Sequence, residues 1–443
     1  MPRFPESAVF YRRLDRDYPV LVRGEGVYLY DASGKRYLDG SGGAVVVNVG
    51  HGRREVAEAL GAQAGQVAYT HGTQFTTAAL EEASRALAER LPAGLDKVYF
   101  LAGGSEATET AIKLARQYQL ACGRPTRYLV VGRWPSYHGN TLAALSVSGR
   151  AALRRPYQPL LLDFPHVPAP FCYRCPLGQT YPDCGVKCAE ALETLLKLEG
   201  PDSVAAFIVE PIIGASAGAA APPPEYFPII RDICNRYEVL LIADEVMTGF
   251  GRTGRFFAIE HFGVVPDIMI LGKGLTGGYA PAGAVAVRTE IAEAIRSRLG
   301  GFTHGHTFSH NPVVAAAARE VLGILKREEL VARAEARGTY LFEKLRVLER
   351  FPIVGDVRGR GLMAGIEFVS DRATKKPFPR SRRLVEEITD RAFARGLILY
   401  PSTGCADGID GDLVMVAPPF IIEESQIDEL VGGLAATLAE VRP

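Results

Sequence analysis

VAAFIVE at residues 204–210 is the first of three hydrophobic runs that each end on an ionisable side chain. The other two are VLLIAD at 239–244 and DIMILGK at 267–273. The three end residues are Glu210, Asp244 and Lys273. Buried strands of a mostly parallel sheet appear as continuous apolar runs, and ligands bind beyond their carboxyl ends. The runs therefore predict three neighbouring strands with an active site at their carboxyl edge.

Lys273 indicates the kind of chemistry. It lies between Gly272 and Gly274, which have no side chains, so a bulky partner can approach its amine. A lysine amine at a strand end, beside a buried acid, suits a Schiff base to a carbonyl cofactor.

Composition limits the class of protein. With 443 residues, 47% of them hydrophobic, the chain can bury a large core, and we expect two domains. The formal net charge is zero, which argues against nucleic acid as the main partner. The amino terminus has no apolar core of signal-peptide length, and no apolar run approaches a membrane span. We expect a soluble, cytoplasmic protein.

The order of apolar patterns predicts an α/β fold. Residues 26–40 alternate apolar and polar positions and indicate a hairpin. Helical and strand patterns then alternate at 80–90, 98–101, 106–121 and 128–131. This alternation is typical of a mostly parallel central sheet. A long Ala-rich helical pattern covers 313–348, and shorter strand and helix patterns after it indicate a smaller α+β domain.

We therefore expect three units in the chain. Residues 1–65 form an amino-terminal segment that packs with the small domain, 66–325 form the large domain, and 326–443 form the small domain.

Four of the seven cysteines cluster in a Pro- and Gly-bearing stretch that resembles an insertion. They are Cys172, Cys175, Cys184 and Cys188. Their spacing fits a structural zinc site, but it also fits reduced thiols in a loop or two local disulfides. No histidine or supporting signature favours the metal, and we assign none.

A second pattern is suited to binding phosphate. An apolar strand leads into Gly103-Gly104-Ser105 and then into a helical pattern. The free amides of a first helical turn bind anions, and the Ser105 hydroxyl adds a donor. The same pattern also fits an ordinary turn and cap. Tyr137 and His138 follow another strand and would reach the same edge of the sheet.

Taken together, these residues resemble the class III aminotransferases, which are pyridoxal-phosphate enzymes of fold type I. The matching segments are LLIADEVMTGFGRTG at 240–254, PDIMILGKGLTGGYAPAGA at 266–284, GGSEATETAIKLAR at 103–116, YHG at 137–139, VEP at 209–211, HTFSHNP at 306–312 and VRGRGLMAGIE at 357–367. They follow the order of the family across nearly the whole chain.

The resemblance implies a role for each matching residue. Lys273 would form the Schiff base and carry the proton during catalysis, and Asp244 would keep the pyridine nitrogen protonated. Val246 would pack under the ring and Tyr137 would cover its other face. The remaining cofactor-binding residues are Gly104 and Ser105 at the phosphate, together with His138 and Glu210 near the ring.

The resemblance also implies a homodimer. Thr307 matches the threonine that reaches the phosphate of the neighbouring subunit's cofactor. Glu210 resembles an acid on the phenolic side of the ring, although a structural charge at a strand end is the alternative.

The departures from the family concern the substrate. Relatives that use α-amino acids carry an arginine that clamps the carboxylate, and a glutamate that pairs with it. This chain has Met415 and Ala215 at those places, and Met247 replaces a glutamine near the ring hydroxyl. We expect an apolar pocket. If 2-oxoglutarate is nevertheless preferred, another arginine, such as Arg150 or one from a partner subunit, must bind its distal carboxylate.

The sequence thus predicts an enzyme that moves an amino group from an amine or ω-amino acid to a keto acid such as pyruvate. An aminomutase or a decarboxylase of the same family could use Lys273 and Asp244 unchanged. A non-catalytic binding protein on the same fold is the third alternative, and the intact lysine, acid and phosphate loop argue against it.

Overall fold

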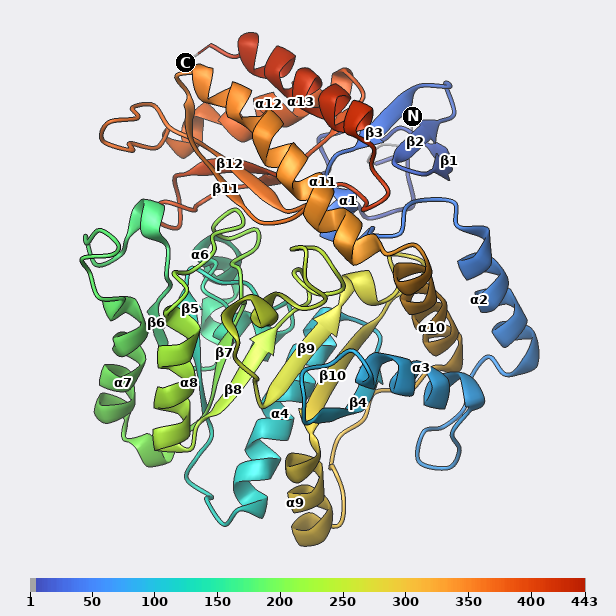
Figure 1. The fold of residues 1–443 in the computed structure, drawn as a ribbon, viewed down its shortest axis with the longest axis vertical. Coiled ribbons are helices and arrows are strands. Elements are labelled where there is room, and N and C mark those ends of the chain that lie inside the picture. The colour runs from blue at the N-terminus through green and yellow to red at the C-terminus, as the bar shows by residue number, and fades with distance from the viewer. Residues whose placement is uncertain (1–4, 443) are drawn as a thin grey trace.

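The computed structural model describes residues 5–442 and is built in two tiers, with a large sheet and its helices below and a smaller sheet with three helices above (Figure 1). The large sheet has the order β4-β10-β9-β8-β7-β5-β6. Its strands are β4 (Leu95–Leu101), β10 (Gly283–Arg288), β9 (Ile268–Gly272), β8 (Leu240–Asp244), β7 (Val204–Val209), β5 (Leu129–Trp134) and β6 (His166–Pro168).

The large sheet is mostly parallel. Strands β6, β5, β7, β8 and β9 pair in parallel, whereas β10 is antiparallel to both of its neighbours, β9 and β4. The three quoted apolar runs form the adjacent strands β7, β8 and β9. The expected α/β fold is confirmed.

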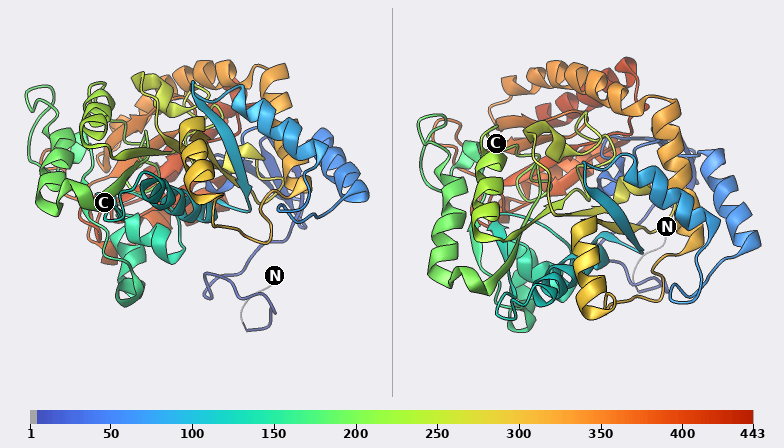
Figure 2. Two further views of the ribbon diagram at one scale, coloured as in Figure 1. Left: turned by 90° about the horizontal axis from the view of Figure 1, so that it is seen from below. Right: turned by 60° about the horizontal axis from the view of Figure 1, so that its bottom comes forward.

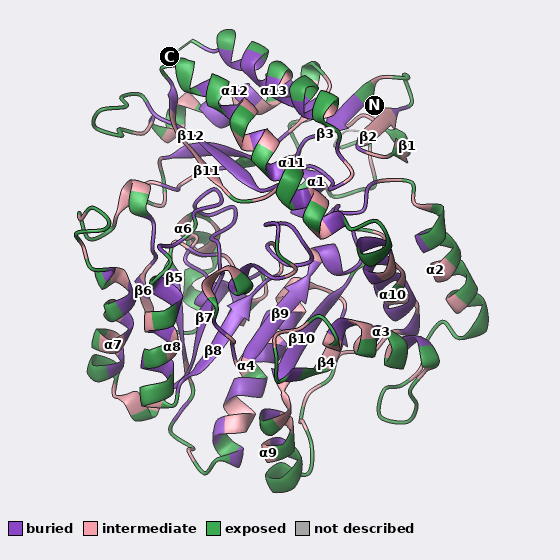
Figure 3. Cartoon of the chain, viewed as in Figure 1, coloured by how far each residue is buried: buried purple, intermediate pink, exposed green. Residues whose placement is uncertain are grey.

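Alternate residues of these strands pack into two different cores. Phe207, Leu241 and Met269 face one hydrophobic cluster, while Ile208 and Ile242 face the other. Successive side chains of a strand point to opposite faces, so both faces of the sheet are covered. This double burial explains why the runs are continuously apolar. Figure 3 shows the strands buried between helices whose outer turns are exposed.

Helices cover both faces of the sheet. α4 (Gly104–Ala121) and α9 (Thr289–Leu299) contribute to one core. α3 (Ala78–Ala88), α7 (Lys187–Glu199), α8 (Tyr226–Tyr237) and α10 (Pro312–Arg327) contribute to the other. The views in Figure 2 show the same arrangement and show the segment before β1 extending away from the body. Four further α-helices, outside the upper tier described next, are α1 (Gly42–Val45), α2 (Arg54–Gln66), α5 (Leu142–Val147) and α6 (Ala151–Arg154).

The upper tier is built around an antiparallel sheet of order β11-β12-β15-β14. Its strands and helices are β11 (Val354–Gly359), β12 (Ala364–Phe368), β15 (Asp412–Val416), β14 (Tyr400–Ser402), α11 (Leu330–Leu345), α12 (Leu384–Ala394) and α13 (Glu424–Ala439). A third sheet joins the two ends of the chain, because β13 of the carboxyl-terminal part pairs in parallel with β3. Its strands are β1 (Leu21–Glu25), β2 (Tyr28–Asp31), β3 (Arg36–Asp39) and β13 (Leu397–Ile398).

The expected division at 65 and 325 stays a prediction, and the outermost residues of its terminal units, 1–4 and 443, lie outside the described residues. Within 26–40, the predicted hairpin is present as the antiparallel pair β2 and β3.

The helical segment expected over 313–348 is present, but the chain divides it into α10 and α11. Glu329 lies between them with a φ of 49°, in the left-handed region. Asn311 starts α10, since its side chain accepts hydrogen bonds from the amides of Val313 and Val314. The break lets α11 leave the lower tier and pack on α13 (Figure 1).

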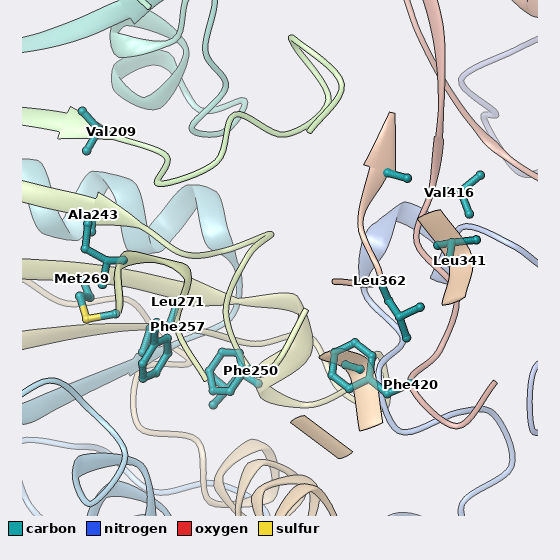
Figure 4. Close-up of a cluster of buried hydrophobic side chains, with 14 of the residues drawn as sticks. Val209, Ala243, Phe250, Phe257, Met269, Leu271, Leu341, Leu362, Val416 and Phe420 are labelled. Atoms are coloured by element: carbon teal, nitrogen blue, oxygen red, sulfur yellow. The ribbon is translucent and has the colours of Figure 1, made fainter. Parts of the chain in front are cut away.

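One apolar cluster joins the tiers. Figure 4 shows Met269 and Leu271 on the sheet, Phe250 and Phe257 beyond them, and Phe420 on the side of the upper tier. The fully buried Arg252 lies at the same boundary between the tiers and donates hydrogen bonds to the carbonyls of Leu362, Pro418 and Val47. The apolar cluster and the hydrogen bonds of Arg252 therefore connect the two tiers near the carboxyl edge of the large sheet.

Candidate active site

The structure gathers the predicted residues around one cavity of about 510 Å³, which lies at the carboxyl ends of β7, β8 and β9 and at the start of α4. Eight of the nine predicted site residues line it, namely Gly104, Ser105, Tyr137, His138, Glu210, Asp244, Val246 and Lys273. Thr307 does not line the cavity of its own chain and is exposed.

Lys273 follows β9 directly, in a left-handed conformation with φ 43°. Gly274 lies in a tight place beside it, because a Cβ there would lie 3.1 Å from side-chain atoms of Asn48 and Phe250, which would have to shift. Burial lowers the pKa of the Lys273 amine to about 8, and the nearby carboxylates of Asp244 and Glu210 oppose that shift only in part. Roughly a tenth of the amine is therefore neutral and nucleophilic at pH 7, a far larger fraction than an exposed lysine with its ordinary pKa would have.

Asp244 ends β8 and is held by two hydrogen bonds. Its Oδ2 lies 2.7 Å from Nδ1 of His138, and its Oδ1 accepts a hydrogen bond from the Val246 amide at 3.0 Å. Only 4% of the Asp244 side chain is exposed. Nε2 of His138 is buried without a hydrogen-bond partner among the described residues. The carboxylate is thus fixed in a dry position facing the cavity.

Glu210 follows β7 and ties two loops to the sheet. Its Oε2 accepts a hydrogen bond from the Tyr137 amide at 3.3 Å, and its Oε1 accepts one from the Gly214 amide at 3.2 Å. Burial raises the pKa of the Glu210 carboxyl, while His138 and Arg133 act in the opposite direction. These contacts give Glu210 a structural role in the cavity wall, and its predicted contact with a ring stays a prediction.

The start of α4 has the form expected of an anion seat. The first turn of a helix leaves amides free to bind a ligand. Gly103 precedes the helix in an extended conformation, and Ser105 Oγ accepts a hydrogen bond from the Asn140 amide at 3.0 Å. A Cβ at Gly139 would lie 2.7 Å from Ser105 Oγ, and one at Gly104 would lie 3.1 Å from Val246. Because Gly104 and Gly139 have no side chains, the anion site at the start of α4 stays accessible and lies next to Val246.

The substrate side of the cavity differs from expectation at one residue. Ala215 lines the cavity together with Ile212 and Met247, as an apolar pocket requires. Met415, however, is fully buried and packs with Ala215 in one hydrophobic cluster, so it does not reach the cavity.

Sequence reasoning did not single out several of the lining residues. They are Val46, Ala102, Thr248, Thr276, Gly278, Tyr279, Ala280, Pro281 and Ala282. All of them except Val46 and Ala102 lie in the family-like runs 240–254 and 266–284, which could have suggested them as neighbours of the site.

The cysteine stretch forms no disulfide, and all seven cysteines are free. Among residues 5–442, no three His, Cys, Asp or Glu side chains are grouped so that they could hold a metal ion. In the same part of the chain, no helix is both long enough and apolar enough to cross a membrane.

Comparison with known proteins identifies the family. The family description "Aminotransferase class-III" matches residues 11–438. The chain belongs to the class III aminotransferases. It is 43% identical over 429 residues to the uncharacterized aminotransferase YodT of Bacillus subtilis, which covers 97% of this chain and 96% of the relative.

Two further relatives have more descriptive names. A putrescine–pyruvate aminotransferase of Pseudomonas aeruginosa is 37% identical over 425 residues, covering 95% of this chain and 91% of the relative. The crystal structure of an (S)-enantioselective omega-transaminase from Thermomicrobium roseum matches with a TM-score of 0.90 and 41% identity, covering 96% of this chain and 93% of that one. The chain is thus an enzyme that transfers amino groups between small molecules.

Proposed function

We propose that this class III aminotransferase moves an amino group from an amine or ω-amino acid to a keto acid such as pyruvate, with pyridoxal phosphate held by Lys273. One observation carries the proposal. The buried Lys273 amine, with its pKa lowered to about 8, faces a cavity whose substrate wall is apolar at Ile212, Ala215 and Met247.

The residues present fit pyridoxal phosphate, which members of this family use. The cofactor needs an amine for its aldehyde, an acid for its ring nitrogen and an anion seat for its phosphate. Lys273, Asp244 and the start of α4 supply these groups around one cavity. Gly104 leaves space for the phosphate, because a side chain there would lie 3.1 Å from Val246 and would fill the space beside the helix terminus.

When bound, pyridoxal phosphate supplies the electron sink that stabilises a carbanion on the substrate carbon. Asp244, which His138 and the Val246 amide orient, would hold a proton on the ring nitrogen. The Lys273 amine would take the proton from the substrate carbon and deliver it to the C4′ atom of the cofactor, a role suited to a base whose pKa is near the working pH. Tyr137 and Val246 line the cavity and would limit access of water to the ring.

The proposed donor class rests on the apolar wall. Ile212, Ala215 and Met247 present an apolar surface that suits the carbon chain of an amine or ω-amino acid better than a second charged group. The name of the putrescine–pyruvate relative supports an amine donor and pyruvate as acceptor for this chain as well.

We also propose that the working unit is a homodimer. Thr307 is exposed and lies outside the cavity of its own chain, as a residue that serves the partner subunit would. The neighbouring Phe308 is 57% exposed, which suits an interface.

A donor panel tests the function. The purified holoenzyme is incubated with diamines, ω-amino acids and α-amino acids, each with pyruvate or 2-oxoglutarate, and the amino product is measured. We expect amines or ω-amino acids with pyruvate to react fastest. Carbon dioxide release would instead identify a decarboxylase, and migration of the amino group within one molecule would identify an aminomutase.

A further inference from the structure

The cavity leaves the carboxylate of a keto acid without a counter-charge. Among the described residues that line it, Lys273 is the one lysine or arginine, and catalysis occupies that amine. A carboxylate that enters an apolar pocket needs a charged hydrogen-bond donor to replace its water. A cation must therefore reach the cavity from just outside its lining.

Arg150 is held beside the lining by its neighbours in the chain. The side chain of Ser148 accepts a hydrogen bond from the His138 amide at 2.8 Å, and the Gly149 amide donates to the Ser136 carbonyl at 3.1 Å. These two contacts fasten the segment that carries Arg150 to the segment that carries the cavity residues Tyr137 and His138.

The guanidinium of Arg150 is tied to the cavity wall. Its Nη2 donates to Ser402 Oγ at 2.9 Å, and the buried Ser402 hydroxyl donates in turn to the carbonyl of Ala215 at 2.5 Å. Ala215 lines the cavity. On the other side, burial raises the pKa of the Tyr137 phenol, and Arg150 acts to lower it, so the guanidinium lies within electrostatic reach of a ring that lines the cavity.

Most of the hydrogen-bonding capacity of Arg150 is not used. Ser402 is the one hydrogen-bond partner that the described residues give it, although a guanidinium carries five N–H donors. Arg154, four residues later, is different, because it donates to three backbone carbonyls and so has a structural role. Arg150 is half-buried, oriented by one bond and able to receive a ligand.

We infer that Arg150 binds the carboxylate of the keto acid acceptor and that Ser402 is its positioning residue. The inference rests on the proposed function for the direction of transfer. It places the acceptor's negative charge on the lower tier, beside Tyr137, rather than on β15 of the upper tier. A planar guanidinium suits the two oxygens of a carboxylate.

The test separates the two halves of the reaction in the holoenzyme. Arg150→Gln removes the charge, Arg150→Lys keeps it, and Arg155→Gln is the matched control on an exposed arginine of the same segment. The first half-reaction uses an amine without a carboxylate that the wild type accepts, and the second uses pyruvate. We expect Arg150→Gln to raise the half-saturating pyruvate concentration at least about tenfold, because a charged hydrogen bond is lost.

The other variants refine the expectation. The amine half-reaction of Arg150→Gln should stay within about twofold of wild type, Arg150→Lys should regain part of the pyruvate affinity, and Arg155→Gln should match wild type. Ser402→Ala should weaken pyruvate binding less than Arg150→Gln does. Propionate, which carries a carboxylate but no keto group to react, should inhibit Arg150→Gln more weakly than wild type by a similar factor.

Two results would overturn the inference. One is an Arg150→Gln enzyme with unchanged pyruvate saturation and unchanged propionate inhibition. The other is an equal loss in both half-reactions together with a lower Tm, which would show a structural role. A wild type that transfers no amino group from any amine to pyruvate would instead refute the proposed function, and this result is distinct because it appears before any variant is made.

Discussion

The carboxyl edge of the large sheet and the apolar wall of the cavity, which Met415 of the upper tier packs against from behind, are built in opposite ways. At the edge, Asp244 and Glu210 each accept two hydrogen bonds, and burial shifts the pKa of Lys273 and Glu210. At the wall, Ala215 and Met415 pack with other apolar side chains and carry no charge. The difference indicates that the strand ends supply the chemistry, whereas the apolar wall shapes the space for the substrate and the upper tier supports that wall from behind.

The largest effect should come from the edge. Lys273→Ala removes the amine that holds the cofactor and carries the proton, so we expect transamination to fall by about 10⁴-fold or more. The fold should survive, since the change deletes a buried amine and leaves the φ of 43° as the one strained feature. Product formation and a thermal melt are the measurements, with Lys97→Ala, an exposed lysine on β4, as the control. Substantial residual turnover would show that Lys273 is not the reacting amine.

Asp244→Asn should have the next largest effect. The amide keeps the shape of the side chain but cannot balance a protonated ring nitrogen, so we expect a rate loss of about 10²-fold or more. The visible band of the bound cofactor and single-turnover rates report it. Asp202→Asn is a suitable control, because that side chain is 89% exposed. A near-normal rate with the cofactor in place would show that Asp244 does not contact the ring nitrogen. It would also weaken the conclusion that the strand ends supply the chemistry.

These two regions also differ in how well the sequence predicts them. The ends of β7, β8 and β9 could be predicted because a continuous apolar run that stops at a charge marks the carboxyl end of a buried strand. The position of Met415 could not, because every residue of β15 is buried and the strand shows no polar face. Met415 and Leu413 pack toward Ala215, while Val414 and Val416 pack on the opposite side.

The break between α10 and α11 could not be predicted either. Glu328 and Glu329 are good helix formers, so local propensity favours one continuous helix over 313–348. Tertiary packing overrides it, because α10 covers the large sheet and α11 packs in the upper tier. The residues that carry chemistry were thus easier to place than those that shape the wall, whose position depends on packing between distant segments.

Met415→Arg tests whether Met415 is buried behind Ala215 and separated from the cavity. An arginine there would enter an apolar cluster without a partner, and we expect a loss of about 3 kcal/mol or more in the free energy of unfolding, measured in urea. Met415→Leu, which keeps the volume, should cost less than about 1.5 kcal/mol. Adding Ala215→Glu to Met415→Arg should recover part of the loss by pairing the charge. If the single arginine variant is stable and gains 2-oxoglutarate use, Met415 reaches the cavity after all.

The smallest expected effect concerns the protonation of the Lys273 amine at the edge of the sheet. The pKa of Lys273 is lowered to about 8, mainly by burial, so the neutral amine of the cofactor-free protein should increase as pH rises through 8. We expect the rate of cofactor attachment to rise about tenfold from pH 7 to pH 9 and then level off, because the neutral fraction saturates one unit above the pKa. Absorbance of the attached cofactor after rapid mixing measures this rate. An exposed lysine would instead keep gaining rate up to its ordinary pKa near 10.4. A rate that still rises steeply above pH 9 would therefore mean that the apolar surroundings do not activate Lys273, and that the edge is more open to water than the buried contacts of Asp244 and Glu210 imply.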